Sequence, residues 1–455
     1  NIRFFETQLG DSTMLDCYVM LTKSKHKSVS FEVEGTNSAG DLGAAASVAF
    51  QNRNLFRGSE TFMIKFRGAY EVISGLQAGY SNNNYTEYGV ETSINFPNFL
   101  FPFLSSDFKR RIRATTEFGL QYNYQLRPEF LRTMASANWS YKWTQRQKIQ
   151  HRIDLINIGF LYLPRISDRF REDYINKGQN HIFQYNYQDR LIVNMGYSYN
   201  YNSVGGSIVN NTIASNSYSI RFTFLSGIGG RAMWRENAID TGTMISEMEP
   251  TYASFLTLMI VPGTPLHEEY LKGEFDFAKN IRIDHRNSFA FHAGLGIAVP
   301  YGNAKTIPFE KQYFSGGANS VRGWSVRDLG PGSFAGNGNL LDQSGDIKLD
   351  ASIEYRSKLF WKFQGAVFID AGNIWTIRSY ANQPGGVFKF DRFYKQIAVA
   401  YGLGLRLDLD FFILRFDGGM KAVNPAFETK KERFPIIHPK FSRDFAFHFA
   451  VGYPF

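Results

Sequence analysis

Cysteine is nearly absent from this chain of 455 residues, which contains Cys17 alone. A single cysteine excludes an intramolecular disulfide and a metal site built from several thiolates. We expect Cys17 to be buried as a small apolar side chain. Long apolar runs are absent too: the longest candidate, residues 252–261, has about half of the ~20 residues that a membrane-spanning helix needs. The sequence therefore excludes a helical membrane protein.

The sequence also lacks the short motifs of common enzymes. It contains no H-E-x-x-H, no G-x-S-x-G and no phosphate-binding loop. His267 precedes two glutamates, but no histidine follows four residues later, and the glycine-rich residues 332–338 open no predicted helix. We therefore expect no enzymatic activity, no cofactor and no metal site. A protease whose acidic and histidine side chains come from separate loops stays open as an alternative, because such a site leaves no local spacing.

Long runs of basic residues are missing, although the chain carries a formal net charge of +9. No run of Lys and Arg reaches the length of a basic arm, so we expect no binding of nucleic acid. The excess of positive charge is typical of solvated loops and of the polar walls of a cavity. Contact with anionic lipid headgroups is the functional alternative.

Aromatic residues, in contrast, are abundant: 16% of the chain, with 43 Phe and 25 Tyr. Together with a mean hydropathy of -0.28, this favours strands that alternate lipid-facing and lumen-facing side chains. Residues 347–356 show the pattern well, because Ile, Leu, Ala, Ile and Tyr at odd positions oppose Lys, Asp, Ser, Glu and Arg at even positions. Such alternation predicts β-strands with one apolar and one polar face.

From Ser28 onward, this alternation recurs in long segments that turn residues separate. We expect strands at residues 28–37, 42–52, 60–80, 85–96, 110–124, 131–143, 149–162, 181–202, 216–229, 268–282, 286–300, 346–358, 362–375, 396–410, 411–423 and 442–455. About sixteen strands, an even number, suit a single-chain outer-membrane barrel, and closure removes the open edges of the sheet. The predicted fold is an all-β, antiparallel transmembrane barrel that comprises residues 28–455.

One stretch fits neither a strand nor a hairpin turn. Residues 313–334 read YFSGGANSVRGWSVRDLGPGSF, in which the glycines permit positive φ and Pro331 blocks a helix. The run IPFEKQYFSGGANSVRGW, residues 307–324, resembles the signature loop of the BamA/TamA superfamily of outer-membrane barrels, the bacterial surface antigen family. The resemblance is also specific at FIDAGN, residues 368–373, and at the C-terminus. It implies that the loop folds back into the barrel lumen.

The resemblance implies functional roles for the loop and for acids on later strands. The loop motif comprises Val321, Arg322, Gly323 and Trp324. In the family, the arginine of this motif is received by the aspartate of an F-x-D-x-G strand motif, with a glutamate on the preceding strand nearby. The loop-anchoring acids are therefore expected to be Asp370, Glu354 and Asp417.

The resemblance further implies a lateral gate between the first and last strands, where client strands pair by β-augmentation. We expect this gate at Val29, Phe31, Val33, Gly35, Phe445, Phe447, Phe449 and Val451. A C-terminal assembly signal is expected at Phe449, Val451, Tyr453 and Phe455, with Phe455 as the last aromatic at the lipid edge. Gly and Pro at positions 452 and 454 weaken ladder pairing. An ordinary closed seam is the alternative.

Residues 1–27 lack the barrel pattern. Residues 14–21 indicate one strand, and the basic residues 23–27 follow it. The resemblance implies that residues 1–27 are the C-terminal remnant of a periplasmic POTRA domain with its linker. No signal peptide opens the chain, and because an outer-membrane protein needs export, we expect a processed or trimmed chain. The long segment 230–267 could hold a short helix or cap the barrel mouth.

The resemblance implies an assembly or translocation factor of the bacterial outer membrane, closer to the TamA-like branch. Its expected partners are client outer-membrane or secreted proteins and outer-membrane lipid or lipopolysaccharide. A periplasmic or inner-membrane assembly partner is expected to bind through domains upstream of residue 1. The alternatives are a BamA core subunit, a two-partner secretion translocator and, from another class, a passive diffusion porin.

Overall fold

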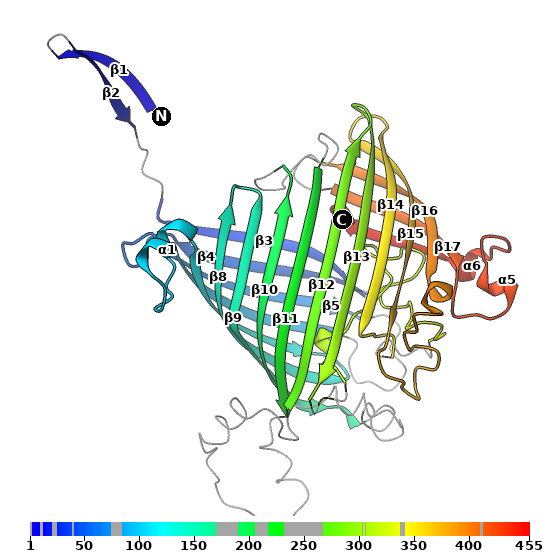
Figure 1. The fold of residues 1–455 in the computed structure, drawn as a ribbon. Helices are drawn as coiled ribbons and strands as arrows, with labels where there is room; N and C mark the ends of the chain where they lie inside the picture. The colour runs from blue at the N-terminus through cyan, green and yellow to red at the C-terminus, as the bar shows by residue number, and fades with distance from the viewer. Residues whose placement is uncertain are drawn as a thin grey trace, which may run out of the picture.

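The structure is a computed structural model, and it describes residues 2–9, 12–20, 25–38, 41–73, 84–168, 171, 190–204, 217–231, 267–302, 304, 306–336, 342–409 and 413–455. Sixteen strands form one antiparallel sheet in which each strand pairs with its neighbours in the chain. Figure 1 shows this sheet curling on itself, with the later strands and their loops on one side. The predicted all-β fold with sixteen antiparallel strands is confirmed.

The strands of this sheet are β3 (Lys27–Ser38), β4 (Asp41–Asn52), β5 (Thr61–Val72), β6 (Asn84–Phe96), β7 (Thr115–Leu126), β8 (Phe130–Gln145), β9 (Ile149–Ile166), β10 (Arg190–Asn202), β11 (Ser217–Arg231), β12 (His267–Arg282), β13 (Asn287–Tyr301), β14 (Ile347–Lys358), β15 (Phe363–Trp375), β16 (Ala398–Asp408), β17 (Ile413–Val423) and β18 (Phe445–Val451). The described helices are short: α1 (Ser106–Ile112), η3 (Phe309–Lys311), η4 (Phe393–Gln396), α5 (Lys430–Arg433) and α6 (Phe441–Asp444). None of them has the length and apolar character to cross a membrane.

Local chemistry explains two of the tight turns. Arg146 and Gln147, between β8 and β9, both have positive φ, which is the backbone of the two-residue hairpin turn that matches strand twist. Between β12 and β13, the Asp284 carboxylate accepts hydrogen bonds from the backbone N–H groups of Arg286 and Asn287 at 2.7 and 2.8 Å. An aspartate that bonds its own following backbone fixes a turn without help from the rest of the fold.

The connections at the two ends of the sheet differ in length. Residues 53–60, 146–148, 283–286 and 359–362 make short turns at one end, where 97–114 is the longer exception. Residues 302–346, 376–397 and 424–444 make long connections at the other end, where 127–129 is a short exception. Outer-membrane barrels carry short turns on the periplasmic side and long loops outside. The end where β3 begins and β18 finishes is therefore the periplasmic end.

Alternate side chains separate an apolar outer face from a polar interior. On β14 and β15, Ile353 and Val367 are about half exposed, while their neighbours Glu354 and Phe368 are buried. Large apolar side chains that remain exposed along strands belong to a wall that faces lipid. Most of the large, fully buried side chains lie inside the sheet against β13 to β18, where the described residues of loop 302–346 pack.

Several predicted strand limits are wrong. Residues 110–112, expected to begin a strand, belong to helix α1, and residues 442–444 belong to α6. The last strand ends at Val451, so residues 452–455 lie outside it. The strand expected at 60–80 ends at Val72, and most of segment 230–267 lies outside the described residues, as does 181–189.

At the N-terminus, β1 (Ile2–Leu9) and β2 (Ser12–Val19) form a hairpin of their own. Figure 1 shows it apart from the barrel, and no ladder joins it to the barrel within the part of the chain that the structure describes. The strand expected at residues 14–21 is present as β2, and its partner β1 went unrecognised. Cys17 is exposed on β2, so the expectation of a buried cysteine is wrong. Assignment of residues 1–27 to a POTRA domain stays a prediction.

Candidate functional site

Loop 302–346 forms a compact structure fastened at its base. Tyr313 and Gly345 exchange two backbone hydrogen bonds of 2.8 and 2.9 Å, which hold the entry and exit of the loop together. Further in, Val321, Trp324 and Leu329 pack with two alanines of β16 in a buried cluster. These contacts turn the loop inward, and Arg322 becomes fully buried.

Arg322 meets Asp370 of β15 in a two-pronged ion pair. Its Nε donates to Oδ2 and one terminal amino group donates to Oδ1, both at 2.8 Å, and its backbone N–H donates to Oδ2 at 3.1 Å. The guanidinium also lies 3.5 Å from the ring centroid of Phe368. Because a planar, bidentate pair is directional, this contact fixes the orientation of the loop as well as its position.

The structure brings all three predicted loop-anchoring acids to Arg322. Its Nη1 lies 2.6 Å from Oε2 of Glu354 on β14 and 3.4 Å from Oδ2 of Asp417 on β17. The side chains of these acids are fully buried. The loop is therefore joined by charge to three different strands of the wall.

Three further arginines complete a buried cluster that sequence reasoning missed. Arg356 lies 2.7 Å and Arg406 2.9 Å from Glu354, and Arg406 and Arg415 lie 3.0 and 3.1 Å from Asp417. The cluster thus holds four guanidinium groups against three carboxylates. Breaking one buried pair leaves an uncompensated charge in a medium that solvates it poorly, so the members depend on one another. Each of these arginines occupies an inward position of its strand, and this alternation is the sequence signal that could have identified them.

Small residues let the loop reach this depth. A Cβ on Gly323 would lie 2.8 Å from the Cβ of Ala400 on β16, and a Cβ on Gly419 of β17 would lie 2.1 Å from the carbonyl oxygen of Arg322. Any larger side chain at either position would push the loop from the wall. The glycine of the loop motif is therefore required by close approach of two backbones.

The last strand touches the loop directly. His448 of β18 lies with Nε2 2.9 Å from the carbonyl oxygen of Arg322. Arg415 on the neighbouring β17 donates to the carbonyl oxygen of Ala318 at 2.9 Å and to the side chain of Asn319 at 2.6 Å. A movement of the loop would therefore disturb its contacts with the last two strands, β17 and β18.

The predicted gate residues lie on the two ends of the sheet. β3 pairs only with β4 and β18 only with β17, and no ladder between β3 and β18 occurs among the described residues. Val29, Phe31 and Val33 are 68–70% exposed, and Phe447 and Val451 are 62–63% exposed. Phe445 is half-buried and stacks on Phe441, Phe449 packs against Phe416, and Gly35 lies opposite Ala44. The two edges are thus apolar on the outer face.

The end of the chain leaves the wall, so the prediction that Phe455 is a lipid-edge aromatic is wrong. Gly452, with φ of +85°, ends β18. Beyond it, the Tyr453 hydroxyl donates to Gln364 at 2.9 Å, and its ring lies 4.3 Å from the guanidinium carbon of Arg356. Phe455 stacks on His292 at 5.2 Å. Of the expected assembly signal, only the residues at 449 and 451 remain on the outer face.

A buried carboxylate supports the loop at its base, where β14 begins. Asp346 directly precedes β14 and accepts the backbone N–H of Ile377 at 2.9 Å. Its own backbone N–H donates to the carbonyl oxygen of Trp375 at 2.7 Å. Burial raises the pKa of Asp346 to about 6, against the opposing effects of the Ile377 hydrogen bond and of Arg378. The folded loop therefore binds the proton of Asp346 more tightly than the unfolded chain does.

Comparison with known proteins identifies the family to which this barrel is similar. Residues 52–455 match the model of the Omp85 superfamily domain. The outer membrane protein assembly factor BamA of Neisseria meningitidis serogroup B is 34% identical over 95 residues, which cover 19% of this chain and 11% of that protein. The match therefore spans a small part of that relative.

One solved structure shows the same fold. BamA from Haemophilus ducreyi lacking POTRA domains 1–3 aligns with a TM-score of 0.57 at 14% identity, covering 99% of this chain and 75% of that one. CdiB from Acinetobacter baumannii aligns with a TM-score of 0.47 at 10% identity, covering 99% of this chain and 65% of that one.

Replacing the loop arginine tests the anchor. Arg322→Ala leaves buried carboxylates without their partner, which costs about 3–5 kcal/mol, so we expect the loop to leave the wall. Protease cleavage within residues 313–334 and current noise in planar bilayers should both rise, and Asp370→Ala should have the same effects. Arg392→Ala is the control, because it removes an exposed pair with Asp391. Single variants as protected and quiet as the wild type would contradict the anchor.

The inward position of the tail is tested at Tyr453. Tyr453→Ala removes both the hydrogen bond to Gln364 and the ring over Arg356, a contact of about 1 kcal/mol. We expect hydrogen exchange of the peptide 450–455 to become about fivefold faster, with Tyr453→Phe intermediate. Phe447→Ala, on the outer face, should leave that rate unchanged. Equal rates in all four proteins would show that the tail is not held in the lumen.

The raised pKa of Asp346 predicts an unusual pH dependence. An unfolded aspartate titrates near ~3.9. The stabilising contribution is therefore present in full below about pH 4 and is lost as the pH rises through about 6. We expect Asp346→Asn to raise the thermal midpoint at pH 7.5 and to flatten its change between pH 4.5 and 7.5. Asp391→Asn, at an exposed site, serves as the control, and a wild-type slope in Asp346→Asn would refute the assignment.

Proposed function

The chain belongs to the Omp85 superfamily and lies in the bacterial outer membrane, and on that premise we propose that it inserts or translocates client proteins through a lateral opening between β3 and β18. The observation that carries this proposal is the pair of strand edges without a ladder between them in the described residues. The relative from Neisseria meningitidis, an outer membrane protein assembly factor, supports a function that acts on other proteins.

Strand lengths favour the seam as the point of opening. β18 has 7 residues, whereas β3 and β4 have 12 each. Each ladder hydrogen bond contributes about 1 kcal/mol. A ladder between β3 and β18 could not exceed the 7 residues of β18, so it would separate more readily than the 12-residue ladder between β3 and β4. Unpaired edges present backbone N–H and C=O groups that a client strand can satisfy by adding itself to the sheet.

The ion-pair cluster around Arg322 holds the β18 side of the proposed opening in place. Arg322 binds β14, β15 and β17 through buried charges, and its carbonyl group contacts His448 of β18. A client that pairs with β18 would therefore meet a strand whose position is held from within. Pairing of strands needs no bond chemistry, and we propose a function without enzymatic activity or a cofactor.

Within the superfamily, we assign the chain to the TamA-like branch because the loop keeps VRGW together with LGPGS. A BamA core subunit and a two-partner secretion translocator are the neighbouring alternatives. The branches differ in the domains upstream of the barrel. We propose that residues 1–27 belong to such a domain and that a periplasmic or inner-membrane partner binds through these domains. The sequence before residue 1 would decide between them.

A cross-link across the seam tests the lateral opening. With Cys17 replaced by Ser, we expect Phe31→Cys/Phe449→Cys and Val33→Cys/Phe447→Cys to block client insertion once oxidised, because the two edges can no longer separate. Insertion of a radiolabelled client barrel into liposomes is the measurement, and reductant should restore it. Folding should be unaffected, as judged by heat-modifiable migration.

The matched control joins two strands that are already paired. Leu405 on β16 lies opposite Phe416 on β17, so the disulfide Leu405→Cys/Phe416→Cys should leave insertion unchanged. Full activity of the locked seam would exclude the lateral mechanism and favour passage through the lumen. Steady open-channel conductance of the wild type, together with that result, would indicate a diffusion porin instead.

A further inference from the structure

The connection between β6 and β7 lies against the outer wall of the barrel. The Thr116 hydroxyl accepts the N–H of Leu100 at 2.9 Å and donates to the carbonyl oxygen of Asn98 at 2.8 Å. Phe99 then packs on Tyr141 of β8, with ring centroids 4.7 Å apart. The chain is thus folded back along the sheet at its periplasmic end.

Strand alternation shows that this contact is on the lipid-facing side. Lys142 and Glu117 form an ion pair of 2.5 Å on the inner face of β7 and β8, so Tyr141 points outward. Leu120, on the outer face, is 63% exposed, yet Tyr141 is 2% exposed because the rings at positions 99 and 101 cover it. Residues 97–104 therefore occupy space that lipid would otherwise fill.

The covering rings continue an aromatic band across β6, β7 and β8. Successive ring contacts of 4.7–6.5 Å join Phe56, Phe96, Phe118, Trp139, Tyr141, Phe99, Phe101 and Phe103. Aromatic belts of this kind lie where hydrocarbon meets the headgroups. The position of the band therefore sets the level of the membrane surface beside β6, β7 and β8.

Helix α1 follows the band directly and is strongly basic. Its N-cap is Ser105, whose side chain accepts the N–H of Phe108, and its C-cap is Arg113, in the left-handed conformation. Lys109, Arg110, Arg111 and Arg113 lie within five residues, and no ion pair to them occurs among the described residues. Phe103 and Phe108 remain 86% and 42% exposed. Exposed rings beside free cations are the pattern of a segment that lies in a membrane interface.

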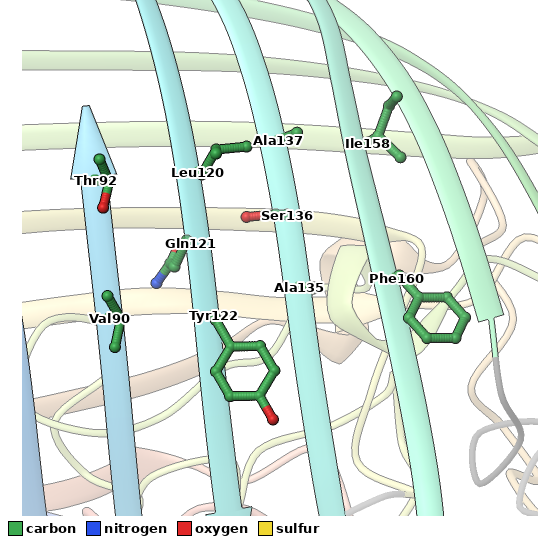
Figure 2. A pocket seen from close by; sticks show the side chains of 10 residues that line it. All are labelled: Val90, Thr92, Leu120, Gln121, Tyr122, Ala135, Ser136, Ala137, Ile158 and Phe160. Atoms are coloured by element: carbon green, nitrogen blue, oxygen red, sulfur yellow. The ribbon is translucent and has the colours of Figure 1, made fainter. Parts of the chain in front are cut away.

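A groove runs outward from the same band. It has a volume of about 360 Å³ and lies on the outer face of β6 to β9. Ala135 and Ala137 form its floor, between Leu120 and Tyr122 on one side and Ile158 and Phe160 on the other, as Figure 2 shows. It adjoins the band, because Leu120 lies two residues from Phe118 on β7 and Ala137 two residues from Trp139 on β8. An acyl chain that begins at the headgroup level would therefore reach it.

We propose that residues 97–113 and this groove bind an anionic phospholipid of the periplasmic leaflet. The three cations of α1 and its C-cap Arg113 hold the phosphate, the aromatic band packs against the glycerol region, and the groove takes one acyl chain. Charge complementarity selects the occupant, because a Lys or Arg at a membrane surface favours anionic lipid by about fivefold each. The inference rests on the barrel and its orientation and is independent of the proposed client insertion.

Native mass spectrometry of the full chain tests this site. The protein is reconstituted in equal amounts of dioleoylphosphatidylglycerol and dioleoylphosphatidylcholine, then released in detergent. We expect retained lipid to be enriched about fivefold or more in phosphatidylglycerol. The variant Lys109→Gln/Arg110→Gln/Arg111→Gln/Arg113→Gln should retain the two lipids nearly equally. High salt during release should have the same effect on the wild type, since it screens exposed charges.

A charge-matched variant at the other end of the barrel is the control. Lys389→Gln/Arg392→Gln/Lys430→Gln/Lys431→Gln removes the same charge from outer loops and should keep the enrichment. Ala135→Leu/Ala137→Leu fills the groove and should lower the number of retained lipids without changing their ratio. Heat-modifiable migration shows that each variant is folded. If the α1 variant retains the same enrichment in phosphatidylglycerol as the wild type, the proposal is wrong. The cations would then be available to an acidic protein partner.

Discussion

A buried guanidinium group is the constraint on which this structure depends. Arg322 is fully buried, and a charge in that position is stable only with matched, hydrogen-bonded partners. Asp370 matches it in two places, and Glu354 and Asp417 draw in three more arginines. Since these groups come from one loop and four strands, the inward fold of the loop and the shape of the wall determine each other.

The second constraint is closure of the sheet, because a barrel must bring its first and last strands, β3 and β18, together. The best-anchored strands, β14 to β17, adjoin the shortest one, β18, which Gly452 ends after 7 residues. The tail then binds Arg356, a member of the same cluster, instead of extending the ladder. Strong interior contacts thus replace strand pairing at this edge. That replacement leaves backbone groups of the seam available to another strand.

Alternation predicted the sixteen strands because membrane walls impose it residue by residue. It did not predict α1, since residues 110–112 sit beside a strand and carry no face signal of their own. The anchor of Arg322 followed from family resemblance alone, because 48 residues separate it from Asp370 and no local spacing links them. Arg356, Arg406 and Arg415 were visible as inward charges, but which acids they meet depends on register. The position of the C-terminal tail was predicted wrongly for a related reason. Gly452 indicates that the strand ends, but it does not indicate in which direction the chain continues.

The interior is filled unevenly, and this bears on how a seam could open. Inward side chains of β15 are mostly buried, whereas those of β8 are mostly half-exposed, because the loop packs on the later strands. The later half of the barrel is therefore cross-linked by charge, and the earlier half is held by its ladders. If the edges separate, the earlier strands bend more easily, since no buried ion pair of the loop cluster must break. A lipid contact at α1 would give that more pliable half its own fixed point at the membrane surface. Opening then becomes a movement between two anchored halves, with β3 travelling and β18 staying with the loop.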